Sequence, residues 1–437
     1  MSNNQETKAN VTTTDDNSSV QPITRELVES LAPTVRLTDS DLENNLDLFC
    51  YIRCSPEDSD VIKNCRGVIF HGNDLVLKSF PYTEELNNEQ VEEIQKKCVN
   101  LTECQVFKSY EGALLRIFNY NGKWYVTTHR KLDAFHSKWA SRHESFGSTF
   151  QKALEAEFKE HSNFLPELME RLKVEPEEIL QSFMSTLNPE KQYMFLVLNT
   201  AENRIVCQAP TRPTVFHVGT RNKNGEELSF DENVGLPYPE KLHFDTVEQL
   251  TTYVKNADPT SYQGVVVFTK DGDHFKVLNT DYQELFQVRG NEPSIKFRYL
   301  QLRMDKTKGD KLYWLYPKYA DKFDEYENTL YEIAKNIYKS YVARYIPPRE
   351  YVARPKEEFL VMDACHKEYM ETRQRISVRK VIEVLNQQPA TNLNRMIRRF
   401  NTETQTDSQP MNNAPINTRL PSMLNRPTPP IPQVDEN

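Results

Sequence analysis

Residues 112–129 read GALLRIFNYNGKWYVTTH, two apolar runs on either side of Asn121-Gly122. Asn-Gly suits a two-residue turn between antiparallel strands, because both residues adopt positive φ at little cost. Runs rich in Leu, Ile, Val and aromatic residues are typical of strands. We therefore expect a hairpin that turns at Asn121-Gly122, and a β-sheet protein around it.

Further strand patterns lie on both sides of this hairpin. Residues 65–70 and 75–78 flank the polar turn at residues 71–74, which predicts a second hairpin. Residues 193–208 alternate between apolar and polar, which predicts a strand, a turn and a strand. The short apolar runs at 264–268 and 275–278 predict two buried strands.

Helical patterns are concentrated after residue 300. Residues 89–98 and the charged segment 131–185 are expected to be helical, but the clearest periodicity begins at Tyr319. Apolar residues then recur every three or four positions, at Phe323, Tyr326, Leu330, Ile333, Ile337, Tyr341 and Tyr345. Pro347-Pro348 ends this helix, and more helices are expected at 356–375, 377–387 and 390–400.

These patterns predict an α+β protein with two antiparallel-rich sheets followed by a helical C-terminal domain. We expect the sheet domain to span residues 26–300 and the helical domain residues 301–401. The polar segment 1–25 and the Pro- and Asn-rich segment 402–437 are expected to be disordered tails that are available to protein partners.

Composition excludes several classes of protein. The chain of 437 residues has a net charge of −9, so nucleic-acid contacts must come from local basic patches. Its seven cysteines follow no zinc spacing, and its nine histidines form no triad pattern. No secretory signal and no long apolar run is present, so we expect a cytoplasmic protein with no membrane segment and no metal site.

Five short motifs occur in order on the expected strands. They are Arg66–Phe70, Lys108–Gly112, Phe195–Val206, Gln263–Val266 and Lys276–Tyr282. Together they resemble the RNA-ligase family of phage T4 type, in which covalent nucleotidyl transfer starts from a lysine. A looser resemblance, carried by Thr128–Phe135 and Arg298–Arg303, is to ligase-like early proteins of iridoviruses and other large DNA viruses.

The resemblance implies a nucleotidyltransferase fold and a set of roles. Lys108 would be the catalytic nucleophile, with ATP and Mg²⁺ as cofactors and RNA as substrate. The residues that would bind the nucleotide are Arg66, Glu111, Gly112, Gln263 and Lys276.

The sequence also departs from the family pattern at residues that carry chemistry. The family lysine stands two residues before the acidic residue, whereas Lys108 stands three before Glu111. Because side chains alternate on a strand, Ser109 occupies the expected nucleophile position unless a bulge restores the lysine. Leu196 and Gln263 replace two family carboxylates, and Leu278 replaces a lysine.

A basic segment stands apart from these motifs. Residues 373–399 contain seven Lys or Arg and one acid, Glu383. Arg395, Arg398 and Arg399 are therefore candidate nucleic-acid contacts, and the alternative is a solvated or internally paired helix face.

Three hypotheses follow from these observations. The first is a divergent RNA-ligase-like viral early protein that binds nucleotide or RNA without adenylating itself. The second is an active ATP-dependent RNA ligase with Lys108 on a bulged strand. The third is a structural or interaction protein without nucleotide binding.

Overall fold

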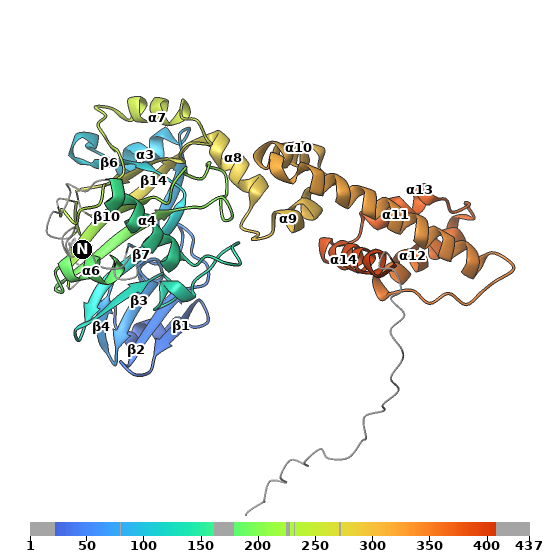
Figure 1. The fold of residues 1–437 in the computed structure, drawn as a ribbon. Coiled ribbons are helices and arrows are strands. Elements are labelled where there is room, and N and C mark those ends of the chain that lie inside the picture. Colours follow the sequence, from blue (N-terminus) through green and yellow to red (C-terminus); the bar gives the residue numbers. More distant parts are fainter. Residues whose placement is uncertain are drawn as a thin grey trace, which may run out of the picture. The chain divides into compact units, whose positions relative to one another are not determined.

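The computed structural model describes residues 22–78, 80–160, 179–223, 228–230, 232–270 and 272–407. The chain forms two compact units, residues 1–320 and residues 321–437 (Figure 1). The first unit contains all fourteen strands of the described residues, in three sheets, and the second is helical. The α+β class predicted from the sequence is confirmed.

The N-terminal sheet consists of β1 (Val35–Asp41), β2 (Leu46–Tyr51), β3 (Arg66–His71) and β4 (Asp74–Leu77), in that order and antiparallel. Two short helices, α1 (Arg25–Ser30) and α2 (Asp60–Asn64), accompany it. Its β3–β4 pair is the hairpin predicted at residues 65–78. The four strands form a sheet of their own, which adds a third sheet to the two expected.

The hairpin sheet contains the predicted turn at Asn121-Gly122. Its strands are β7 (Gly112–Tyr120), β8 (Lys123–Thr127), β9 (Lys191–Leu198), β10 (Val215–Asn222) and β11 (Leu228–Ser229), in the order β11-β10-β9-β7-β8. Asn121 and Gly122 have φ angles of 51° and 81°, as this tight turn requires. The helices α4 (Phe146–Glu160) and α6 (Ile179–Thr186) bury one face of the sheet.

The motif sheet carries three of the five motifs. Its strands are β5 (Glu84–Asn87), β6 (Gln105–Ser109), β12 (Lys241–Leu242), β13 (Gly264–Phe268) and β14 (His274–Leu278), in the order β12-β6-β13-β14-β5. Figure 1 shows α3 (Val91–Lys97) and α7 (Val247–Lys255) beside this sheet, and the two helices contact each other. We call the face that they cover the outer face; its core residues include Val106, Val265 and Val277.

The opposite, inter-sheet face of the motif sheet packs against the hairpin sheet. Phe107 and Phe268 from β6 and β13 form one apolar cluster with Met194 from β9 and with Phe80. The chain passes from one sheet to the other at Tyr110-Glu111, between β6 and β7. Both residues of this crossing therefore lie where the two sheets meet.

Helices complete both units. The first unit ends with α8 (Thr280–Arg289), α9 (Ile295–Leu302) and α10 (Lys306–Leu315). The second contains α11 (Ala320–Tyr345), α12 (Lys356–Thr372), α13 (Val378–Asn386) and α14 (Ala390–Asp407). Six of the seven periodic residues predicted for α11 are buried, and Tyr345 is half-buried. This confirms the helical period.

Two local predictions differ from the structure. Only α4, α6 and a 3-10 turn at Ala134–His136 occupy the described part of segment 131–185, while residues 161–178 lie outside the described residues. The second strand predicted within 193–208 is absent, because residues 199–208 form turns and irregular backbone. Most of the two predicted tails lies outside the described residues, although α14 continues to Asp407.

Candidate functional site

The register of β6 decides which side chain of the Lys108–Gly112 motif reaches the inter-sheet face. Lys108 pairs with Val265 and Ser109 pairs with Gly264, and the β6–β13 ladder runs without a bulge. Paired residues in antiparallel strands point to the same side of the sheet. Because Val265 belongs to the core of the outer face, Lys108 points to that face as well. Ser109 is buried on the inter-sheet face.

Lys108 is held on the outer face by two contacts. Its Nζ lies 2.5 Å from Glu240 Oε2 and 5.0 Å from the centre of the Tyr262 ring. The hydrogen bond to Glu240 raises the pKa of the Lys108 amine, which therefore stays protonated at neutral pH. A protonated amine has no lone pair with which to attack phosphorus.

A chain of hydrogen bonds connects the motif residues on the inter-sheet face. Ser109 Oγ and Lys276 Nζ donate to Gln263 Oε1, at 2.9 Å and 3.0 Å. Gln263 Nε2 donates to Tyr282 OH at 2.7 Å, and Tyr282 OH donates to Glu111 Oε1 at 3.0 Å. Three motifs that are far apart in the sequence therefore meet at one site, which brings together Glu111, Gln263 and Lys276.

Glu111 is a buried carboxylate that accepts hydrogen bonds from three neighbouring groups. Besides Tyr282, the backbone N–H groups of Val206 and Ile205 donate to it, at 2.7 Å and 3.2 Å. Burial raises its pKa, and these hydrogen bonds act in the opposite direction. In place of a neighbouring strand, Glu111 accepts the hydrogen bonds of the Ile205 and Val206 N–H groups in this segment.

Gly112 has a packing role at this crossing. A Cβ atom there would lie 2.4 Å from the backbone oxygen of Val197 on β9, which is closer than atoms can approach. Only glycine lets β7 lie so near to β9 at this position.

Three cations lie near His274 on the inter-sheet face. Lys276 is two residues further along β14, Arg66 shares the partner Thr83 with His274, and Arg221 shares the Phe80 ring with it. Burial together with these charges lowers the pKa of His274 to about 3. Its Nε2 lies 2.8 Å from Thr83 Oγ1. We call Arg66, Arg221, His274 and Lys276 the cation cluster.

Two members of the cation cluster differ in their neighbours: Arg66 contacts neutral groups, whereas Lys276 lies near carboxylates. Arg66 Nη1 donates to the neutral groups Thr83 Oγ1 and Pro81 O, at 3.2 Å and 3.3 Å. Lys276 Nζ lies 3.7 Å from the half-exposed Glu85, and burial lowers the pKa of the lysine. A bound anion would offset the cost of keeping these charges near one another.

Leucine stands at two positions where the family has charged side chains, a carboxylate at position 196 and a lysine at position 278. Leu196 is half-buried between Leu114 and Phe216 of the neighbouring strands, and Leu278 is buried. Leucine accepts no hydrogen bond and binds no metal ion. Within the described parts of the chain, no group of three His, Cys, Asp or Glu side chains could hold a metal ion.

Comparison with known proteins agrees with the motifs. The chain is 30% identical, over 312 residues, to an immediate-early protein ICP-46 homolog of Invertebrate iridescent virus 6, a match that covers 69% of this chain and 66% of the relative. It is 24% identical over 237 residues to a candidate bifunctional polynucleotide kinase/RNA ligase of Autographa californica nuclear polyhedrosis virus, covering 51% of this chain and 30% of that protein. The chain is a divergent RNA-ligase-like relative of the iridovirus immediate-early proteins.

The matches cover just under two thirds of the iridovirus relative and under a third of the baculovirus protein. An archaeal ATP-dependent RNA ligase of known structure aligns with 86% of this chain and 77% of its own, at 12% identity and a TM-score of 0.36. No family model matches the chain. None of the helices described in this RNA-ligase-like protein is long and apolar enough to span a bilayer.

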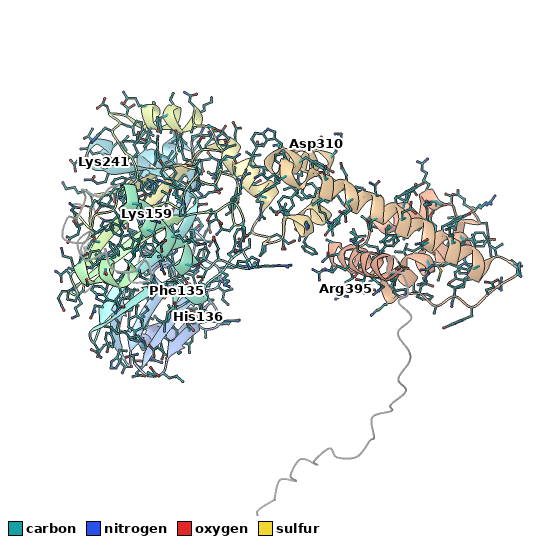
Figure 2. All side chains as sticks on the ribbon, viewed as in Figure 1. Phe135, His136, Lys159, Lys241, Asp310 and Arg395 are labelled. Atoms are coloured by element: carbon teal, nitrogen blue, oxygen red, sulfur yellow. The ribbon has the colours of Figure 1, made fainter. Side chains whose placement is uncertain are left out.

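The basic segment of this RNA-ligase-like protein is partly neutralised within the helical unit. Arg395 of α14 is labelled in Figure 2. Arg395 and Arg399 lie 3.4 Å and 3.2 Å from the carboxylate of Glu357 on α12. Arg379 pairs with Glu383 in the same way, at 3.4 Å. Arg398 is exposed. The face around Arg398 therefore keeps a smaller positive excess than the sequence suggested.

Sequence reasoning missed two members of the cation cluster. His274 stands two residues before Lys276 on β14, so strand alternation could have placed both on one face. Arg221 comes from β10 of the hairpin sheet, and its position beside β14 depends on how the two sheets pack. No local pattern in the sequence marks it.

Proposed function

We propose that this RNA-ligase-like protein binds the phosphates of a nucleotide or of RNA at the cation cluster and does not adenylate itself. The observation that carries the proposal is the register of β6. It places the hydroxyl of Ser109, and not the amine of Lys108, beside Gln263 and Lys276.

Self-adenylation requires an amine in line with the α-phosphate, at about 3 Å before attack. Lys108 points to the other side of the sheet and is bound to Glu240. Bringing it to the inter-sheet face would require a one-residue shift of β6 against β13. That shift would also put Gln105 in the place of Val106 in the outer-face core and move Phe107 out of the inter-sheet cluster, which makes it costly.

Phosphate binding needs only what the cation cluster supplies. Guanidinium groups donate paired hydrogen bonds to phosphate oxygens, and an ammonium group adds a compact charge. Arg66 and Lys276 come from two of the motifs that resemble the ligase family, and Arg221 adds a third cation. The alternative is an active ligase with ATP and Mg²⁺. It differs from this proposal in one step, the formation of a covalent bond between Lys108 and the nucleotide.

The covalent step provides a direct test. Incubation with α-labelled ATP or GTP and a divalent metal should give no label that survives a denaturing gel. Lys108→Ala should change the free energy of unfolding by no more than about 0.5 kcal/mol, because its ion-pair partner Glu240 is 57% exposed. A labelled band in the wild type that disappears in Lys108→Ala would establish the enzyme hypothesis instead.

RNA binding by the helical unit is a separate proposal. If α14 contacts phosphates, changing Arg395, Arg398 and Arg399 together to Ala should weaken RNA binding and flatten its dependence on salt. Each lost phosphate contact removes about 0.7–0.9 from the slope of log K against log salt. Arg379→Ala, which removes an arginine paired with Glu383, is the matched control. An unchanged slope in the triple variant would assign these arginines to contacts within the protein.

A further inference from the structure

We infer that the ligand of the cation cluster is recognised through its phosphate chain alone and that its base is not read. This inference rests on the proposed function and specifies the class of ligand. The inference is supported by the aromatic rings and the Gln263 amide beside the cations. A nucleobase would need such groups for stacking and for hydrogen bonds, and here the protein's own contacts already use them.

Aromatic side chains fill the space between the sheets next to the cation cluster. Phe230 lies 4.7 Å from Phe268 and 5.3 Å from Phe107, measured between ring centres. Phe80 lies 5.6 Å from Phe268. Rings at these separations are in van der Waals contact, so no further ring fits between them. The protein's own rings fill this apolar space beside the cations and leave no room there for a purine to stack.

The aromatic cluster is continuous with the cations. His274 contacts Phe80 at 5.3 Å and Phe268 at 5.4 Å between ring centres. The guanidinium carbon of Arg221 lies 5.7 Å from the centre of the Phe80 ring. One side of the cation cluster is therefore closed by packed rings. The side chains of Lys276 and Glu85 are still 23% and 49% exposed, so an anion can approach from their side.

The polar groups that could read a base are also satisfied internally. An amide such as that of Gln263 can recognise a base edge by donating and accepting hydrogen bonds at the same time. Here the Gln263 oxygen accepts from Ser109 and Lys276, and its nitrogen donates to Tyr282. Reading a base would require breaking these bonds, whereas a phosphate needs only the charge of the cations.

The test compares ligands that share a phosphate chain and differ in the base. The full-length protein is titrated with ATP, GTP and inorganic tripolyphosphate, by calorimetry. Their dissociation constants should agree within about threefold, since no contact distinguishes them. If ATP or GTP binds more than about tenfold tighter than tripolyphosphate, the base is read and the inference is wrong. If none of the three binds, and neither of the RNAs described below binds, the proposed function itself fails.

Two RNA probes then identify the source of the phosphates. A short RNA with a 5′-triphosphate and the same RNA with a 5′-hydroxyl are compared with tripolyphosphate. Tighter binding of the triphosphorylated RNA, by at least about tenfold, points to an RNA end. Weaker binding of both RNAs than of tripolyphosphate points to free nucleotides, and equally tight binding of both points to the phosphates of the RNA backbone. Each of these results is consistent with recognition of phosphate alone, provided that the first titration shows no preference for a base.

A space-creating variant tests the role of the rings. Phe230→Ala should open a ring-sized space beside Phe107 and Phe268 and allow ATP or GTP to bind more tightly than tripolyphosphate. Leu242→Ala, on the outer face, is the matched control and should leave the three ligands equal. If Phe230→Ala folds and still binds the three ligands equally, the rings are not what excludes the base.

Discussion

Replacing Lys276 by Met should weaken the binding of ATP and tripolyphosphate by about 10- to 100-fold. A hydrogen bond between charged groups contributes about 1.5–3 kcal/mol, and 1.4 kcal/mol corresponds to a factor of ten. Methionine keeps most of the length of the lysine side chain and removes its charge. Adding Arg66→Ala should weaken binding further, because Arg66 and Lys276 act on the same small volume around His274.

The control for this prediction is a lysine on the other face of the same sheet. Lys108→Met removes the same charge from the motif sheet but on the outer face, beside Glu240, so binding should stay within about twofold of the wild type. Circular dichroism of each variant would show that the fold is kept. If Lys108→Met weakens binding as strongly as Lys276→Met, the phosphates lie on the outer face and the proposed site is wrong.

Replacing Glu111 by Ala should destabilise the first unit by about 3–5 kcal/mol. The change leaves three buried donors without their acceptor: the N–H groups of Ile205 and Val206 and the hydroxyl of Tyr282. Each buried group that loses its hydrogen bond costs about 1–3 kcal/mol. All three tryptophans of the chain lie before residue 321, so urea unfolding followed by tryptophan fluorescence reports on this unit.

Two further substitutions sharpen the Glu111 test. Glu240→Ala removes an exposed carboxylate near the same strand and should change the free energy of unfolding by less than about 1 kcal/mol. Glu111→Gln keeps the shape and should cost less than Glu111→Ala. A loss in Glu111→Ala no larger than that in Glu240→Ala would mean that Glu111 does not hold the crossing between the sheets.

The pH dependence of the Glu111 contribution has a defined sign. Burial raises the pKa of Glu111 above its ordinary value of 4.5, so the folded protein binds this proton more tightly than the unfolded chain. The resulting stabilisation is complete below pH 4.5 and is lost as the pH rises through the folded-state pKa. The free energy of unfolding of the wild type, relative to that of Glu111→Gln, should therefore fall as the pH rises from 4.5 through the folded-state pKa of Glu111.

Local chemistry predicted much of the architecture. Asn121-Gly122 formed the expected turn because both residues tolerate positive φ. Pro347-Pro348 followed the end of α11 at Tyr345, because proline cannot continue a helix. The strand prediction failed at residues 199–208, where the Glu111 side chain, distant in sequence, accepts from the Ile205 and Val206 N–H groups.

The sequence predicted those parts of the candidate site that depend only on the alternation of side chains between the two faces of one strand. The sequence by itself determined that Lys108 and Ser109 point to opposite faces and that leucine replaces a carboxylate at position 196. Only the tertiary structure decided which of those faces meets the other sheet. It also decided that Arg221 from β10 joins Arg66 and Lys276, and that phenylalanines fill the space beside them. Alternation is set by the backbone of each strand, whereas these contacts depend on how separate sheets pack, which no local pattern encodes.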